Sequence, residues 1–400
     1  MSQKKTIGRK ANGTGSIRKV TTTRNGKPYT YWQARYTEGY DPGTGKQIQR
    51  SITGKTQKEV AQKLKQLTHE LDQGTYQAPS KLTVGEWLDI WKTQYTGDVK
   101  ASTAYVYKKN VDMYIIPFLG SVKLQALTAP MIQALYNRLH HPEQDGIKAL
   151  SAKSVRNVHG VLHKALQQAV LVGYLRSNPA DACKPPKSVR KEIVPLDETQ
   201  VSAFLTAIQG HPHEYLYKIT LFTGMREGEV LGLTWDCLDF DRGTLLIKQQ
   251  LRREQKKGGK YYFSPPKNNK SRVLSLAPSV IQLFRLQKLE QNAMRLEAGP
   301  LWEEKNLIFS NQIGSFLSYR TVYDCFKRVM AKIGAPTTRF HDLRHTYAVI
   351  AIQSGDDIKT VQENLGHATA AFTLDVYGHV TAQMRQASAD RMEQFIQSIG

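Results

Sequence analysis

The sequence predicts an α+β protein with several domains: a small three-stranded sheet plus a helix, a helical domain, and a mixed, mainly helical domain with a small antiparallel sheet. Length is the first observation, because 400 residues are enough chain for two or three separate cores. Short β segments separated by turn residues fill the start of the chain, whereas apolar residues at helical spacing dominate the remainder. A polar stretch at 73–80 and a basic, proline-containing stretch at 178–187 then divide the chain into predicted domains 1–75, 81–185 and 192–400.

The first domain is expected to be a β-sheet with one helix. Its three β segments, separated by Asn-Gly and Asp-Pro-Gly turn sequences, are predicted at residues 16–20, 29–36 and 47–52. Thr56 and Glu59 have the spacing of a capping box, which predicts a helix from there to about Leu71. One face of the sheet carries aromatics and the cations Arg18, Lys19 and Arg35, so such a sheet can enter a groove of DNA. The alternative is a small solvated accessory domain.

The second domain is expected to be a bundle of four helices. Thr83 and Glu86 form another capping-box pattern, and an apolar stripe at helical spacing follows them. Three further amphipathic helices are predicted at about 102–116, from Thr128 onward, and at about 153–173, the first of them stopping at Pro117. Their apolar stripes are most simply core, and the basic charge of the bundle indicates a second DNA-holding module.

The charge of the chain is strongly positive and unevenly distributed. Lys and Arg outnumber Asp and Glu by 56 to 34, which gives a net charge of +22. Residues 1–80 contain 15 basic and 5 acidic side chains, residues 81–190 contain 15 and 7, and residues 191–400 contain 26 and 22. Solubility is the simplest explanation of a basic chain, but this concentration in the front half favours contact with nucleic-acid phosphates. The back half must owe its function to specific residues.

Cysteine usage and hydropathy predict a cytoplasmic, soluble protein. Cys183, Cys237 and Cys325 are far apart and odd in number, so a reducing compartment is expected and their spacing predicts no metal site. The basic N-terminal sequence has no apolar run behind it, so no signal peptide is expected. No window approaches the roughly 18 apolar residues of a membrane span, so no membrane contact is expected.

A segment near the C-terminus combines three kinds of side chain: cations that can hold an oxyanion, imidazoles that can move a proton, and a tyrosine that can act as a nucleophile. His341 and Arg344 lie three residues apart, so on a helix they share a face. His367 follows a glycine, which suggests a helix end that opens into a tight turn, and Tyr377 lies ten residues beyond it. Each residue alone is more often structural than catalytic. Together they could hold a phosphodiester and attack it.

Two upstream cations complete this set. Arg226 follows an apolar helix that ends at Gly224, and Glu229 could orient it; the alternative is an ordinary surface ion pair. Lys267 lies in a turn before a β segment, where a lysine can reach a leaving oxygen and donate a proton. Lys270 is the alternative for that role, and a lysine at either position is most often merely solvated.

The complete set resembles the tyrosine recombinase (phage integrase) family over essentially the whole chain. The motifs that carry this resemblance are T-G-x-R-x-x-E at 223–229, H-x-L-R-H at 341–345, L-G-H at 365–367 and Tyr-Gly-His at 377–379. Ser275 departs from the family, which usually has proline there. The resemblance implies six catalytic residues: Arg226, Lys267, His341, Arg344, His367 and Tyr377. It also implies a bivalent integrase with an arm-site-binding sheet, a helical core-site-binding domain and a catalytic domain.

The family mechanism implies that Tyr377 attacks a DNA phosphate, forms a 3′-phosphotyrosyl bond and frees a 5′-hydroxyl. The other implied roles are to hold the non-bridging oxygens (Arg226 and Arg344), to protonate the leaving oxygen (Lys267), to assist deprotonation of the tyrosine (His341) and to hydrogen-bond the phosphate (His367). The sequence has no acidic cluster suited to two Mg²⁺ ions and no Gly-x-x-x-x-Gly-Lys-Ser/Thr loop. Neither metal, ATP nor another cofactor is therefore expected.

The implied function is site-specific recombination for integration and excision of a mobile element, from a temperate phage or from an integrative conjugative element or transposon. The implied partners are double-stranded DNA at core and arm attachment sites and further copies of the chain in a tetramer, with an excisionase and a host DNA-bending protein as further candidates. The helix expected after Thr381 would dock on a neighbouring protomer or pack on its own domain. The alternatives are a type IB topoisomerase, a non-catalytic DNA-binding regulator, and a metal-dependent nuclease or transposase.

Overall fold

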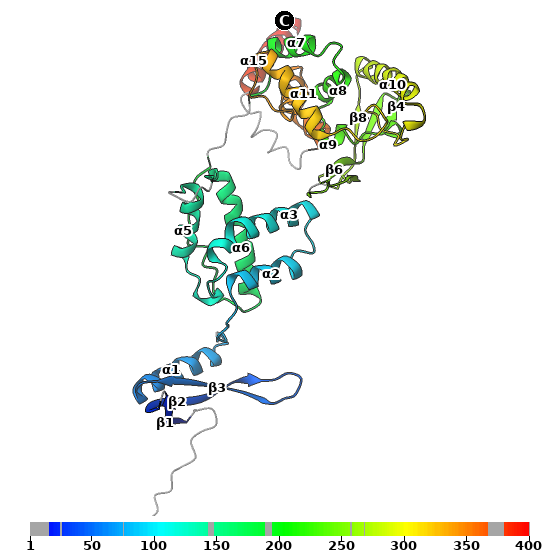
Figure 1. The fold of residues 1–400 in the computed structure, drawn as a ribbon. Helices are drawn as coiled ribbons and strands as arrows, with labels where there is room; N and C mark the ends of the chain where they lie inside the picture. The colour runs from blue at the N-terminus through cyan, green and yellow to red at the C-terminus, as the bar shows by residue number, and fades with distance from the viewer. Residues whose placement is uncertain are drawn as a thin grey trace, which may run out of the picture. The chain divides into compact units, whose positions relative to one another are not determined.

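The computed structural model describes residues 16–24, 26–74, 76–142, 148–188, 194–256, 258–267, 269–366 and 380–399. For residues 24 and 380–388 it describes the backbone alone. The chain divides into two compact units, Met1–Val189 and Arg190–Gly400, and each is described by itself (Figure 1).

The first unit begins with an antiparallel sheet in the order β1 (Ile17–Arg24), β2 (Lys27–Tyr40) and β3 (Gln47–Gly54), against which α1 (Gln57–Asp72) packs. Thr56 caps α1, because its hydroxyl accepts a hydrogen bond from the backbone N–H of Glu59 at 3.2 Å. The core between sheet and helix is small and is formed by Ala34, Tyr36, Val60 and Leu64. The three cations predicted on the sheet, Arg18, Lys19 and Arg35, are exposed. The prediction that they share one face is wrong, because Arg18 and Lys19 are consecutive in β1 and successive strand residues point to opposite faces.

The rest of the first unit is a helical bundle with its own apolar core. Its elements are α2 (Val84–Gln94), α3 (Ala101–Asn110), the π-helical turn η1 (Val111–Ile115), α4 (Ile116–Leu119), the 3₁₀ turn η2 (Leu124–Ala126), α5 (Ala129–His140) and α6 (Ala152–Leu171). The prediction that one helix stops at Pro117 is wrong, because α3 continues into η1 and the proline lies in the first turn of α4. Proline is tolerated there because the first N–H groups of a helix have no intrahelical acceptor.

The second unit is mainly helical and contains two small antiparallel sheets, β4-β5-β8 and β6-β7. Its helices are α7 (Glu198–Ala207), α8 (Glu214–Thr223), α9 (Glu227–Val230), η3 (Trp235–Cys237), α10 (Pro278–Ala298), η4 (Gly299–Leu301), α11 (Tyr319–Lys332), α12 (Asp342–Gln353), α13 (Ile358–Leu365) and α15 (Val380–Ile399). Its strands are β4 (Leu238–Asp239), β5 (Thr244–Ile247), β6 (Gln250–Arg253), β7 (Tyr261–Ser264) and β8 (Arg272–Ser275).

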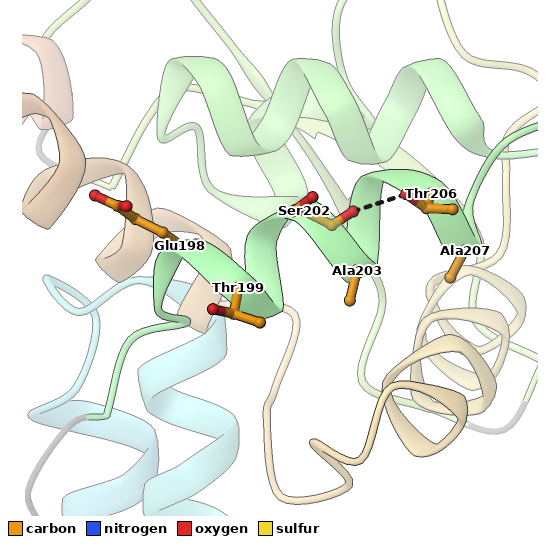
Figure 2. Close-up of a pocket in the computed structure, with 6 residues that line it drawn as sticks. All are labelled: Glu198, Thr199, Ser202, Ala203, Thr206 and Ala207. Atoms are coloured by element: carbon orange, nitrogen blue, oxygen red, sulfur yellow. Dashed lines mark hydrogen bonds between the residues drawn. The ribbon is translucent and has the colours of Figure 1, made fainter.

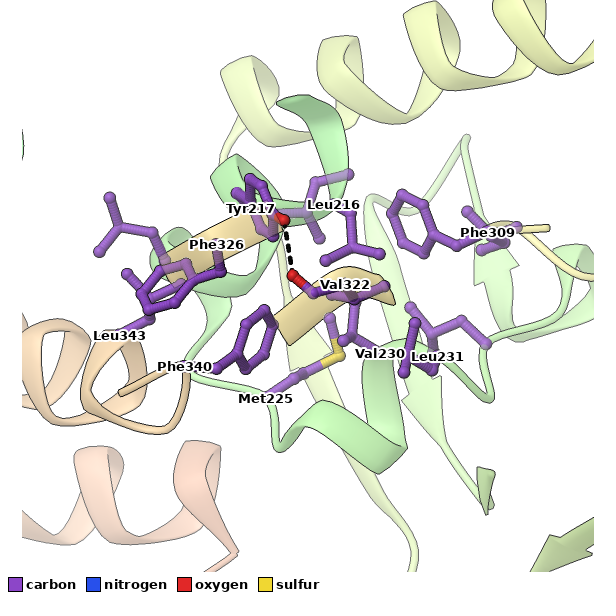
Figure 3. Close-up of a cluster of buried hydrophobic side chains, with 14 of the residues drawn as sticks. Leu216, Tyr217, Met225, Val230, Leu231, Phe309, Val322, Phe326, Phe340 and Leu343 are labelled. Carbon is purple, nitrogen blue, oxygen red and sulfur yellow. Dashed lines mark hydrogen bonds between the residues drawn. The ribbon is translucent and has the colours of Figure 1, made fainter. Parts of the chain in front are cut away.

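One apolar core supports both chain segments that carry described arginines of the predicted site (Figure 3). Met225 and Val230 belong to this core and lie on either side of the first segment in the sequence, and Phe340 and Leu343 precede Arg344 in the second. All four side chains are nearly or fully buried. Because close-packed interiors resist deformation, this core holds the two segments in a fixed relation to each other.

The predicted fold class is confirmed: the chain combines small antiparallel sheets with mainly helical structure. The finer division into domains 1–75, 81–185 and 192–400 stays a prediction. In the part of the chain that the structure describes, no helix is both long and apolar enough to cross a membrane.

Candidate active site

The C-terminal end of α13 is the point at which the described part of the site converges. The last carbonyls of a helix have no intrahelical donor and must find other partners. Three arginines from three elements donate to consecutive carbonyls there: Arg272 Nε to Asn364 at 2.8 Å, Arg344 Nη2 to Leu365 at 2.5 Å and Arg226 Nη2 to Gly366 at 3.1 Å. Cations are favoured at this end of a helix because its carbonyls carry partial negative charge. Arg226 and Arg344, predicted from distant motifs, are therefore neighbours.

Arg226 is the N-cap residue of α9 and is oriented by a buried carboxylate. Its Nη1 donates to Oε1 of Glu229 at 2.7 Å, and its backbone N–H donates to Oε2 at 3.0 Å. Glu229 is fully buried, so the predicted orienting contact is confirmed and the alternative of an ordinary surface ion pair is wrong. Burial alone would raise the pKa of Glu229, but its hydrogen bonds and the charges of Arg272 and Arg226 outweigh burial and lower the pKa to about 2.

Arg344 lies on α12 and is almost completely buried, with 2% of its surface exposed. Its Nη1 donates to the carbonyl of Gly224 at 2.8 Å, which ties α12 to the end of α8. Gly224 has a φ of +61°, and a Cβ there would lie 2.4 Å from Cδ1 of Tyr347 and 2.7 Å from Cδ2 of Leu365. The glycine of the T-G-x-R motif is therefore needed both for backbone conformation and for close approach of the chain.

His341 lies one residue before α12 and three residues before Arg344. Its ring meets that of His345 edge-on, with centroids 5.1 Å apart. Loss of solvent around the ring, followed by His345, Arg344 and Arg226, lowers the pKa of His341 to about 4. A neutral imidazole near neutral pH can accept a proton, as the predicted role requires.

Three predicted catalytic residues remain: Lys267, His367 and Tyr377. Lys267 is exposed and lies in the turn between β7 and β8, five residues before Arg272. A fully extended chain of five residues spans at most about 18 Å, so this turn is tethered near the site. His367 and Tyr377 lie outside the described residues. The roles of these three residues, and the choice of Lys267 over Lys270, stay predictions.

Arg272 is the site residue that the sequence reasoning missed. It begins β8, and its guanidinium binds both oxygens of Glu229 as well as the carbonyl of Asn364. In the sequence it ends the run Lys-Asn-Asn-Lys-Ser-Arg, which resembles a solvated turn. Its position directly before the alternating strand residues was the available signal, because a first strand residue can point inward.

A surface hollow of about 720 Å³ lies elsewhere in this unit, along α7 (Figure 2). Its lining consists of Glu198, Thr199, Ser202, Ala203, Thr206 and Ala207, and the Thr206 hydroxyl donates to the backbone carbonyl of Ser202 at 3.0 Å. None of these residues belongs to the predicted catalytic set. The hollow therefore does not mark the candidate active site.

Comparisons with known proteins identify the class. Residues 195–384 match the sequence model of the phage integrase family, and residues 83–140 match that of the phage integrase N-terminal SAM-like domain. The chain belongs to the phage integrase, or tyrosine recombinase, family.

Similar proteins resemble this chain over most of its length. A XerC-like tyrosine recombinase of Caldanaerobacter subterraneus is 25% identical over 94% of this chain and 98% of its own. The ICEBs1 integrase of Bacillus subtilis is 25% identical over 91% of this chain and 97% of its own. Among solved structures, the Tn1549 transposon integrase in complex with transposon right end DNA is 25% identical, with a TM-score of 0.65, and the match covers 78% of this chain and 100% of that one.

Proposed function

We propose that this protein is a site-specific recombinase that cuts and rejoins DNA at attachment sites, through a 3′-phosphotyrosyl intermediate and a Holliday junction, for integration and excision of a mobile element. The observation that carries this proposal is the convergence of Arg226 and Arg344 on the carbonyls of Leu365 and Gly366. These carbonyls directly precede His367 in the sequence. Two guanidiniums beside a proton-accepting imidazole match what cleavage of a phosphodiester needs.

In the proposed reaction, the Tyr377 oxygen attacks the scissile phosphorus while the bond to the 5′-oxygen breaks. His341 accepts the tyrosine proton, and Lys267 donates a proton to the departing oxygen, so the site's net proton count is unchanged. Arg226 and Arg344 turn donors toward the non-bridging oxygens as charge builds up there. Arginine stays protonated near neutral pH, so the role of both residues is electrostatic. Attack by another strand's 5′-hydroxyl reverses these steps and joins the new partner.

Double-stranded DNA is the proposed substrate, since the Tn1549 integrase is named in complex with DNA and the front half of this chain is strongly basic. A homo-tetramer follows from the reaction, because exchange between two duplexes cuts four strands and each protomer would supply one tyrosine. The proposed chemistry needs neither a metal ion nor ATP. An excisionase and a host bending protein stay predictions, as does the origin of the element.

A nicked suicide substrate carrying the joined ends of the element tests this function. In EDTA, the wild-type protein should form an adduct with DNA that survives SDS, and Tyr377→Phe should form none. DNA binding by the wild type without any adduct would favour a non-catalytic regulator. An adduct that depends on added metal would favour a nuclease or transposase, and one that persists in Tyr377→Phe would identify another nucleophile. Relaxation of supercoiled DNA without strand exchange would favour a topoisomerase.

A further inference from the structure

We propose that Arg272 is a positioning residue. By binding both Glu229 and the end of α13, it fixes the orientation of Arg226 toward the scissile phosphate. This inference rests on the proposed function, because it concerns the arginine pair of the same site. Arg272 would act through its neighbours, and it would not touch the phosphate itself.

The contacts of Arg272 show why it acts indirectly. Its Nη1 and Nη2 donate to Oε1 and Oε2 of Glu229 at 3.0 and 2.7 Å, and its Nε donates to the carbonyl of Asn364 at 2.8 Å. All three guanidinium nitrogens are thus engaged by protein acceptors, and only 11% of the side chain is exposed. A guanidinium held in this way has its charge already paired with a carboxylate inside the protein, whereas the acceptors described above for Arg344 are neutral carbonyls.

Glu229 transmits this constraint to Arg226. Each carboxylate oxygen accepts one hydrogen bond from Arg272 and one from Arg226, so the carboxylate lies between the two residues. Without Arg272, the fully buried carboxylate would keep Arg226 as its single charged partner. Arg226 would then be drawn more strongly to Glu229 and would be a weaker donor to a phosphate.

The same guanidinium fixes the other side of the site. A Cβ added to Gly366 would lie 3.1 Å from Nη1 and 3.3 Å from Cδ of Arg272, so the left-handed cap of α13 is packed directly against this side chain. The carbonyl of Gly366 accepts from Arg226 at 3.1 Å. Arg272 therefore touches both the carboxylate and the helix end between which Arg226 is held.

The test compares Arg272→Lys and Arg272→Met with the wild type in single-turnover adduct formation on the nicked duplex with the joined element ends. Arg320→Met is the matched control, because Arg320 lies in the same unit, is mostly exposed and pairs with the exposed Asp324. Both Arg272 variants should bind the duplex with wild-type affinity but form adduct about 10- to 100-fold more slowly, by analogy with the loss of a hydrogen-bond partner that orients a metal ligand. Arg272→Lys should be less slow than Arg272→Met but slower than the wild type, since lysine retains the charge but lacks the planar guanidinium that donates two parallel hydrogen bonds.

A double-mutant cycle with Arg226→Lys separates positioning from general destabilisation. If Arg272 acts through Arg226, the double variant should be little slower than Arg226→Lys alone, whereas independent effects on folding would multiply. Multiplying effects, full rescue by lysine, or rates equal to those of Arg320→Met would each overturn the inference. Absence of adduct from the wild type would instead overturn the proposed function.

Discussion

Two sets of cations, one in each unit of this chain, are placed in opposite ways. In the first unit, cations such as Arg18, Lys19 and Arg35 are exposed on a sheet with a small core. In the second, Arg272 and Arg344 are nearly buried, and each donates to named carbonyl or carboxylate acceptors. Exposed cations add to a polyanion's attraction roughly in proportion to their number. Buried, oriented cations act by position, so losing one should have a far larger effect.

The largest expected effect is on cleavage by Arg344→Ala. Removal of one donor that stabilises transition-state charge should slow adduct formation by about 10²- to 10³-fold. Single-turnover adduct formation on the nicked duplex measures this rate, and a filter-binding titration measures affinity. The distinction between the two sets of cations would be lost if Arg344→Ala lowered DNA affinity as much as it lowered the cleavage rate, and if Lys19→Ala did the same.

The next largest effect should come from Glu229→Gln, which leaves two guanidiniums without their buried counter-charge. We expect a loss of about 3–5 kcal/mol in the free energy of unfolding, measured by urea titration of the full chain. The matched control is Asp324→Asn, which breaks an exposed ion pair and should change stability by less than about 1 kcal/mol. Equal losses in the two variants would contradict the account.

Glu229 also gives stability a defined pH dependence. Its pKa is lowered from 4.5 to about 2 in the folded protein, so its stabilising contribution is fully present above pH 4.5 and is lost as pH falls toward 2. Glu229→Gln should lack this component. The free energy of unfolding is measured against pH for both proteins and corrected for their difference at neutral pH. Superimposable curves would mean that the charge of Glu229 does not stabilise the fold.

Gly224→Ala should have a smaller effect on stability, about 2 kcal/mol, because it adds both backbone strain and a steric contact. Gly334→Ala is the control: Gly334 also has a positive φ, of +73°, but a Cβ there would meet nothing within 4 Å. Thermal unfolding measures the loss of stability in each variant, and the difference between the two losses gives the contribution of the contact with Tyr347 and Leu365. A larger loss in the control would show that this close approach is unimportant.

His341→Gln should change the dependence of the cleavage rate on pH but leave the affinity for DNA unchanged. Because its pKa is lowered to about 4, the ring should stay neutral down to about pH 5, and the rate should fall only as pH approaches 4. The log of the adduct-formation rate plotted against pH tests this. An inflection near 6.5 that disappears in His341→Gln would mean that the ring titrates as an ordinary histidine.

The smallest effect is expected in the first unit. Lys19→Ala should weaken DNA binding severalfold on all sequences and lower the slope of log affinity against log salt by about 1. Binding titrations at several salt concentrations measure both quantities. Sequence-dependent loss with an unchanged slope would mean that this residue reads bases.

Much of this organisation could be predicted from sequence because the relevant signals are local. The capping pattern of Thr83 and Glu86 marks the start of α2, and the glycine of L-G-H marks the end of α13. The Arg226–Glu229 contact was also predictable, since the residues are three apart. Local patterns could not show that Arg272 meets Asn364 across 92 residues, nor that Pro117 follows a π-helical turn. Those features depend on tertiary packing.

The most direct test of the central claim uses a nicked duplex whose scissile phosphate is replaced by a methylphosphonate, which removes one non-bridging charge. If Arg226 and Arg344 act by neutralising that charge, Arg344→Ala should regain most of its lost cleavage rate on the neutral substrate, relative to the wild type on the same substrate. A defect of equal size on both substrates would contradict the account, because the arginine would then contribute something other than charge.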